Sequence, residues 1–234
     1  MTESYWSNNI PWTFKDLPNP PHYQVRRAMR YALQDYMIDA IGFCNWKGKK
    51  VLEVGCGSGI DAAEFARFGA DVSAIDSSEL AIVETRKIFQ GQNLKGAIKL
   101  ASALALPFED ESFDLVYSFG VLHHIREVGA ALAEIRRVLK EGGQFISMWY
   151  NRDSILYGYS ISYLRLEFER APGVPHARAY SKYEVDELLE KTKFKVDSIR
   201  AHFNVIDLPQ ERKVKLGLSD EYALGWHLIA KARK

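Results

Sequence analysis

The chain has 234 residues, of which 47% are hydrophobic and 26% charged, a composition ordinary for one globular domain. Its 31 basic and 30 acidic side chains give a formal net charge of +1, so no charge imbalance favours nucleic acid or an anionic membrane as a partner. The two cysteines, Cys44 and Cys56, allow neither a disulfide framework nor a metal-binding spacing.

The N-terminal segment MTESYWSNNIPW lacks the basic start and apolar core of a secretory signal, and no apolar run is long enough to span a membrane. We therefore expect a cytoplasmic protein in a reducing compartment. Residues 1–22 contain four prolines and several aromatic side chains, which predicts an irregular arm packed on another part of the molecule. Residues 23–41 repeat apolar side chains at helical spacing, which predicts one helix ending at Gly42.

From Lys50 onward, short apolar segments alternate with helical patterns. The predicted strands are 51–54, 71–75, 98–101, 115–117 and 144–149, and the predicted helices are 60–68, the segment after Ser77-Ser78 to about 89, and 130–139. This alternation predicts an α/β fold of the doubly wound, Rossmann-like type, with a parallel sheet covered by helices on both faces.

The alternation stops after residue 150. Residues 151–180 read as an insertion with one amphipathic helix, and Ser181 with Glu184 matches a capping box that opens a helix to about 191. Two last strands are predicted at 194–201 and 222–230. The expected organisation is a single domain, with an arm and helix (1–45), a cofactor-binding core (46–150), an insertion that acts as lid (151–180) and a C-terminal part (181–234).

The stretch VLEVGCGSG at 51–59 places three glycines at the end of a strand and before a helix. A turn without side chains lets a ligand approach the backbone, and the following helix N-terminus favours an anionic group. A phosphate-binding P-loop is excluded because no lysine follows Gly59. A dinucleotide site would prefer a third glycine at the position of Ile60. A nucleoside with an amino-acid tail is the remaining class.

Asp76 closes the next strand, 21 residues after Gly55. A carboxylate there can accept hydrogen bonds from both hydroxyls of a ribose, a feature that NAD sites and adenosyl sites share. The other role for Asp76 is to cap the following helix.

Four blocks in this order resemble the class I S-adenosylmethionine-dependent methyltransferases: VLEVGCGSG, VSAID at 72–76, LPFEDESFDLVYSFGVLHHI at 106–125 and LAEIRRVLKEGGQFI at 132–146. The resemblance covers about residues 51–150, and the C-terminal GWHLIAKARK is similar to the last strand of the family. It implies a seven-stranded, mostly parallel sheet whose last strand is antiparallel, with S-adenosyl-L-methionine as cofactor.

The resemblance also implies a set of cofactor-binding positions along the strand ends. Glu53 and Gly55 border the methionine end, and Gly57 and Gly59 allow the cofactor to approach the turn. Asp76 binds the ribose, Ser77 lies beside the adenine, Ser102 and Ala103 flank the adenine ring, and Phe119 lies near the methionine moiety. Cys56 and Ser118 are further cofactor-binding candidates. The family commonly has aspartate where this chain has Ser102, so the bond to the adenine amino group is expected to be weaker.

His123 and His124 follow the fourth predicted strand, at the sheet edge where such folds bind ligands, and are the candidate catalytic bases. Tyr150, Tyr157, Tyr159, Tyr163, Arg152 and Arg165 are candidates for an acceptor pocket, with core packing as the alternative for the aromatic rings. The arginines of the first helix, Arg26, Arg27 and Arg30, are expected at the surface, although they could reach a cofactor carboxylate.

The predicted function is methyl transfer to an O, N or C atom of a small molecule. Two other functions stay open: an NAD(P)-binding oxidoreductase, and a non-catalytic module that binds an adenosyl ligand. Nucleic acid is not the expected substrate because the sequence has no basic stripe. Neither the acceptor nor the oligomeric state is specified by a motif.

Overall fold

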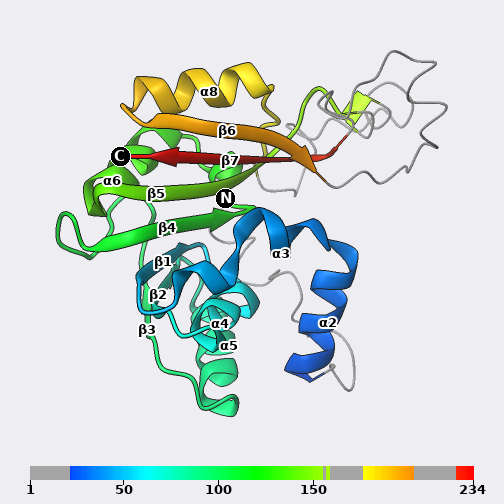
Figure 1. The fold of residues 1–234 in the computed structure, drawn as a ribbon, viewed down its shortest axis with the longest axis vertical. Coiled ribbons are helices and arrows are strands. Elements are labelled where there is room, and N and C mark those ends of the chain that lie inside the picture. Colours follow the sequence, from blue (N-terminus) through cyan, green and yellow to red (C-terminus); the bar gives the residue numbers. More distant parts are fainter. Residues whose placement is uncertain (1–21, 155–156, 159–175, 203–224) are drawn as a thin grey trace.

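The computed structural model describes residues 22–154, 157–158, 176–202 and 225–234 (Figure 1). The predicted arm, except His22, and most of the predicted insertion, including Tyr159, Tyr163 and Arg165, lie outside these ranges.

Seven strands form one sheet in the order β3-β2-β1-β4-β5-β7-β6, in which β7 is antiparallel to both of its neighbours (Figure 1). The predicted fold class is confirmed. The strands are β1 (Lys50–Val54), β2 (Asp71–Asp76), β3 (Ala97–Leu100), β4 (Phe113–Phe119), β5 (Leu139–Tyr150), β6 (Lys195–His202) and β7 (His227–Arg233).

Apolar side chains cover both faces of the central strands, so helices pack on each face (Figure 1). One face packs against the helices of the N-terminal half, and the other packs against those of the C-terminal half. On the first face lie α3 (Tyr36–Ile41), α4 (Ile60–Arg67) and α5 (Glu79–Gly91), with α2 (Tyr23–Leu33) beyond them, and on the second lie α6 (Val128–Val138) and α8 (Lys182–Lys191).

The strand order reverses next to β1, because β2 lies on one side of it and β4 on the other. In open α/β sheets a crevice forms at such a reversal, outside the carboxyl ends of the strands. The glycine turn after β1 and the residues after β4 therefore meet at one edge of the sheet.

Three predicted elements differ from the structure. The single helix over 23–41 is wrong: α2 ends at Leu33, the next residue, Gln34, has a non-helical φ of −129°, and the Asp35 side chain caps α3 by accepting a bond from the Tyr36 N–H at 2.8 Å. β5 begins at Leu139 instead of 144. β7 covers His227–Arg233, whereas the sequence predicts the last strand at 222–230, of which 222–224 lie outside the described residues. The capping box is confirmed, since the side chains and backbone N–H groups of Ser181 and Glu184 bond reciprocally.

Candidate active site

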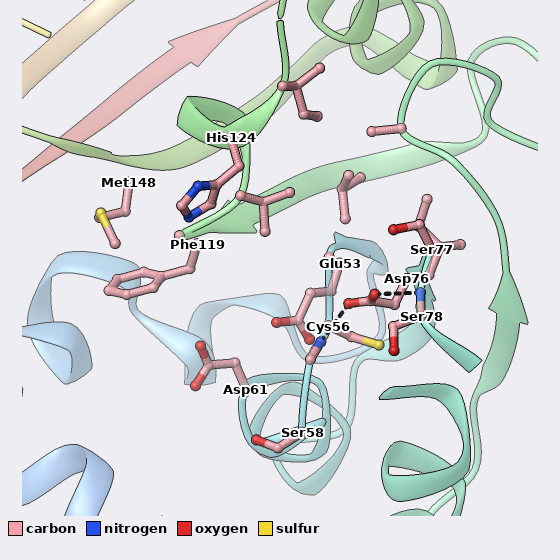
Figure 2. Close-up of a pocket in the computed structure, with 18 of the residues that line it drawn as sticks. Glu53, Cys56, Ser58, Asp61, Asp76, Ser77, Ser78, Phe119, His124 and Met148 are labelled. Carbon is pink, nitrogen blue, oxygen red and sulfur yellow. Dashed lines mark hydrogen bonds between the residues drawn. The ribbon is translucent and has the colours of Figure 1, made fainter. Parts of the chain in front are cut away.

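A cavity of about 570 Å³ lies outside the carboxyl ends of β1, β2 and β4 (Figure 2). The glycine turn, the end of β2, the loop after β3 and the segment after β4 line most of it. Arg30 of α2, Gln34 directly after α2 and His227 of β7 also line the cavity. The volume is that of a typical small-molecule or cofactor site.

The glycine turn has a backbone that other residues rarely adopt. Gly55, Gly57 and Gly59 have φ values of +77°, +52° and +77°. Two consecutive N–H groups, of Gly55 and Cys56, donate to the Ile75 carbonyl at 2.8 and 2.9 Å and fix the turn against β2.

Because glycine has no side chain, other parts of the protein can also pack closely against this turn. A Cβ on Gly55 would lie 2.2 Å from a methyl of Val121, and one on Gly59 would lie 2.6 Å from Thr85 Oγ1. Gly59 therefore permits α5 to pack on the turn, and it does not line the cavity. Close packing of α5 is therefore a second explanation for this glycine, beside the predicted approach of the cofactor.

Asp76 is held at the cavity wall by the protein's own backbone. Its Oδ2 accepts the Gly57 N–H and its Oδ1 accepts the Ser78 N–H, both at 2.9 Å (Figure 2). Burial raises its pKa, and the hydrogen bonds from the backbone oppose that shift. A carboxylate oxygen can accept more than one hydrogen bond, so a fixed Asp76 can still receive two hydroxyl groups. Ser78, not Asp76, caps α5.

Glu53 is almost fully buried beside the turn, and its Oε2 has no hydrogen-bond partner among the described residues. Burial raises the pKa of Glu53, and the negative charge of Asp61 adds to the effect. A buried carboxyl oxygen without a partner is costly, which makes it suited to receive a ligand's cationic N–H groups.

Arg30 completes a buried polar cluster behind Glu53. Its Nε and Nη2 bind Asp61 at 2.7 and 2.5 Å, and the hydroxyls of Tyr31 and Tyr117 donate to the same carboxylate, each at 2.9 Å. Its guanidinium also lies 4.9 Å from the centre of the Phe119 ring. The expectation that Arg26 and Arg30 are surface charges is wrong, because both are buried.

The loop after β3 forms the opposite wall through Ser102, Ala103 and Leu104. The Ser102 hydroxyl accepts the Leu104 N–H at 3.2 Å. It can still form a hydrogen bond toward the cavity, but only as a neutral group.

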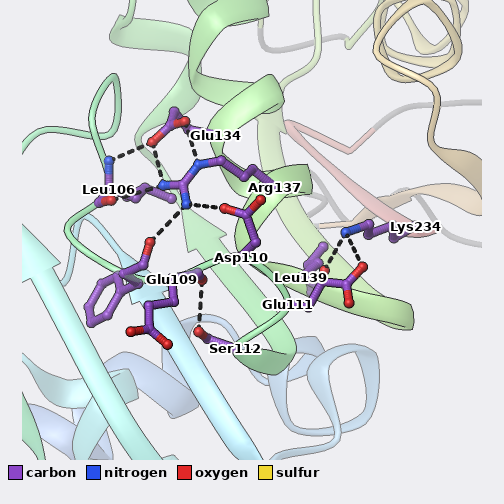
Figure 3. Close-up of polar contacts among 10 residues, drawn as sticks. Leu106, Glu109, Asp110, Glu111, Ser112, Glu134, Arg137, Leu139 and Lys234 are labelled. Atoms are coloured by element: carbon purple, nitrogen blue, oxygen red, sulfur yellow. Dashed lines mark hydrogen bonds and ion pairs between the residues drawn. The ribbon is translucent and has the colours of Figure 1, made fainter.

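Arg137 of α6 holds the continuation of this loop (Figure 3). Its guanidinium donates to the carbonyls of Leu106 and Phe108, at 3.0 and 2.8 Å, and Glu134 accepts the Leu106 N–H at 2.8 Å. These bonds fix the loop that carries the cavity wall.

The two adjacent histidines after β4 occupy different environments. His123 is fully buried and outside the cavity lining, with its ring centroid 3.8 Å from that of Tyr150. His124 lines the cavity, and its Nδ1 lies 2.7 Å from the His176 carbonyl oxygen. Because a carbonyl only accepts, Nδ1 carries the proton, and in the neutral ring Nε2 is the basic nitrogen. Burial lowers the pKa of His124 to about 4, so the ring is neutral near pH 7.

Known proteins share the sequence of this part of the chain. Residues 52–147 match the family model described as a methyltransferase domain. A ubiquinone biosynthesis O-methyltransferase of Pseudomonas fluorescens (strain Pf0-1) is 35% identical over 119 residues, which are 50% of this chain and 51% of that protein. Residues 52–147 therefore resemble a methyltransferase domain.

Solved structures of methyltransferases share the fold of this domain. An S-adenosylmethionine-dependent methyltransferase from Mesorhizobium loti has a TM-score of 0.63 at 18% identity, and the match covers 85% of this chain and 97% of that one. One from Aquifex aeolicus has a TM-score of 0.61 at 19% identity, covering 87% and 91%. The chain spans about half the length of the curated relatives it matches.

Most residues predicted for the methyltransferase site line the one cavity. They are Glu53, Gly55, Cys56, Gly57, Asp76, Ser77, Ser102, Ala103, Phe119 and His124. Three predicted residues, Gly59, Ser118 and His123, do not line it. The Ser118 hydroxyl instead donates to the Val54 carbonyl of the neighbouring strand at 3.0 Å.

The sequence prediction missed Asp61, Met148 and His227, which line this cavity. His227 is buried, and its Nδ1 lies 2.6 Å from the Tyr36 hydroxyl oxygen. Only for Asp61 was a signal present, an acid in the first turn after the glycines. Within the described ranges, no helix is long and apolar enough to cross a membrane, and no three potential ligands cluster to hold a metal ion.

Proposed function

We propose that this chain transfers the methyl group of S-adenosyl-L-methionine to a small-molecule acceptor. The observation that carries the proposal is the pairing, in one cavity, of a backbone-held Asp76 with a Glu53 oxygen that has no partner among the described residues. The first suits a ribose and the second suits the ammonium group of an amino-acid tail.

Different residues of the cavity wall would bind different parts of the cofactor. Asp76 would hold the ribose hydroxyls, and Ser102 with Ala103 would flank the adenine ring. Glu53, with Arg30 nearby, would hold the methionine end. When bound, the cofactor supplies a methyl group on a sulfonium, which leaves readily.

The chain's own task is then to align an acceptor and to keep water out. Phe119, Met148 and Tyr150 give the cavity an apolar wall beside His124. His124 Nε2 would take the proton from an acceptor that must lose one. The hydrogen bond from His124 Nδ1 to the His176 carbonyl would keep the proton on Nδ1 and leave Nε2 unprotonated. His123 would support the position of His124 from the interior.

Calorimetric titration with S-adenosylhomocysteine and with NADH tests the cofactor class. We expect S-adenosylhomocysteine to bind and Asp76→Ala to weaken its binding by about 1.5–3 kcal/mol, the range of hydrogen bonds to a charged group. Asp71→Ala is the matched control, because Asp71 lies at the opposite end of the same strand. Binding of NADH in its place would contradict the proposal.

Transfer of a labelled methyl group to the small-molecule fraction of a cell extract tests the reaction itself. If S-adenosylhomocysteine binds but no fraction of the extract becomes labelled, the chain binds an adenosyl ligand without methylating a small molecule.

A further inference from the structure

A second hollow lies on the same molecule, outside the methyltransferase cavity. It has a volume of about 380 Å³ and is lined by residues of α3 and of the two strands at the sheet's edge, β6 and β7. These residues are Tyr36, Asp39, Ala40, Ser198, Arg200, His202, Ile229 and Lys231. The Tyr36 ring stacks on His202, with centroids 4.9 Å apart and an interplanar angle of 15°.

Two cations without counter-ions face this hollow. Ser198 and Lys231 are register partners, as are Arg200 and Ile229, so Arg200 and Lys231 come from adjacent strands. Neither side chain forms a hydrogen bond or ion pair with any described residue, although Arg233, on β7 like Lys231, is paired with Asp197 at 2.6 Å. Asp39 is the one acid on the described wall of the hollow, and it is exposed.

Burial and the neighbouring positive charges lower the pKa of two side chains at this hollow. Lys231 is half-buried, and burial together with the charge of Arg200 lowers its pKa. The pKa of His202 is lowered by burial and then by the charges of Arg200 and Lys231. Partly buried cations that repel one another are stabilised when an anion binds between them.

We propose that Arg200 and Lys231 form a binding site for a small oxyanion, such as the phosphate, sulfate or carboxylate group of a small molecule. The site goes beyond methyl transfer and does not depend on it. The Ser198 hydroxyl and the His202 ring lie on the same wall and supply further polar groups to such a ligand.

The site borders the methyltransferase cavity through one side chain. Tyr36 lines the hollow, and its hydroxyl contacts His227, which lines the cavity. Tyr36 and His227, joined by this contact, would therefore separate a ligand in the hollow from the expected place of the acceptor.

The test follows the His202 ring by NMR during a pH titration, with its resonance assigned from a His202→Asn variant. Inorganic sulfate is the probe, because it stays doubly charged throughout the titration, and sodium chloride at matched ionic strength is the reference. Sulfate stabilises many proteins without binding a site, so a melting temperature would not serve. We expect sulfate to raise the pKa of His202 by about one unit, the lower end of the effect of a nearby opposite charge.

Variants decide whether the two cations are responsible. We expect the sulfate effect to disappear in the Arg200→Gln, Lys231→Gln double variant and to persist in Lys182→Gln, a control at an exposed lysine of α8. No shift in the wild-type protein, or an equal shift in the double variant, would overturn the site. A comparison of sulfate with glycerol 3-phosphate at fixed pH then shows whether the site reads the oxyanion alone or also its ester. Because no cofactor is present, the outcome is independent of methyl transfer.

Discussion

Replacing Gly59 with alanine tests what the last glycine of the turn is for. Its φ of +77° disfavours any side chain, and a Cβ there would lie 2.6 Å from Thr85 Oγ1 and 2.8 Å from Thr85 Cα. The second atom belongs to the backbone of α5, so the helix would have to move.

The two penalties can be separated. The left-handed backbone costs an alanine about 1–2 kcal/mol. Overlap with a packed helix adds roughly 1–3 kcal/mol. We therefore expect Gly59→Ala to lower the free energy of unfolding by about 2–5 kcal/mol. Gly48→Ala is the matched control, because Gly48 has a φ of +71° and no atom within 4 Å of the added Cβ.

Urea denaturation followed by circular dichroism measures both variants, with an unchanged slope showing that the two-state comparison holds. If Gly59→Ala costs no more than Gly48→Ala, packing of α5 does not explain this glycine. If it also abolishes S-adenosylhomocysteine binding without that extra cost, approach of the cofactor does.

Three further changes test the buried charges of the cavity. Asp61→Asn should lower the free energy of unfolding by about 3–5 kcal/mol, because it leaves the Arg30 charge buried and uncompensated; adding Arg30→Met should recover part of the loss, and urea denaturation showing additive losses would contradict the pairing. Because burial raises the pKa of Glu53 above its usual 4.5, the folded state holds a proton that the unfolded chain has released, so the free energy of unfolding should fall as pH rises from 4.5 through the folded-state pKa. Glu53→Gln should remove that fall and weaken S-adenosylhomocysteine binding, and an unchanged pH profile would refute the assignment. The pKa of His124 is lowered from 6.5 to about 4, so stability should fall as pH drops through that interval, and His124→Gln should reduce the fall in denaturation curves measured at successive pH values.

The strands β1, β2 and β4 could be predicted from the sequence because each is short, mostly apolar and followed by a turn or loop signal. The first helix could not, because the break at Gln34 and Asp35 falls inside an uninterrupted apolar repeat. Asp35 is a good helix start, yet aspartate inside a helix is also common, so its capping bond is visible only in three dimensions.

The different environments of His123 and His124 depend on the geometry of the turn that carries them. Both lie in a single 3-10 turn, Leu122–His124, in which successive side chains point about 120° apart. One histidine therefore enters the interior when the other faces the cavity. The sequence identifies the pair but does not show where the turn begins, and so cannot rank its members.

His227 escaped prediction for another reason. It begins β7, which follows more than twenty residues outside the described ranges, and none of the described residues adjacent to it in sequence lines the cavity. Only the antiparallel pairing of β7 with β5 brings it beside Tyr150.

The bond between Arg30 and Asp61 sets how far the working unit extends along the chain. The family model begins at residue 52, yet α2 supplies one wall of the cavity and half of a buried ion pair. A shortened version starting at the first strand would leave Asp61, with its negative charge, exposed to the solvent side that α2 normally closes. A fragment that keeps this ion pair must therefore include α2.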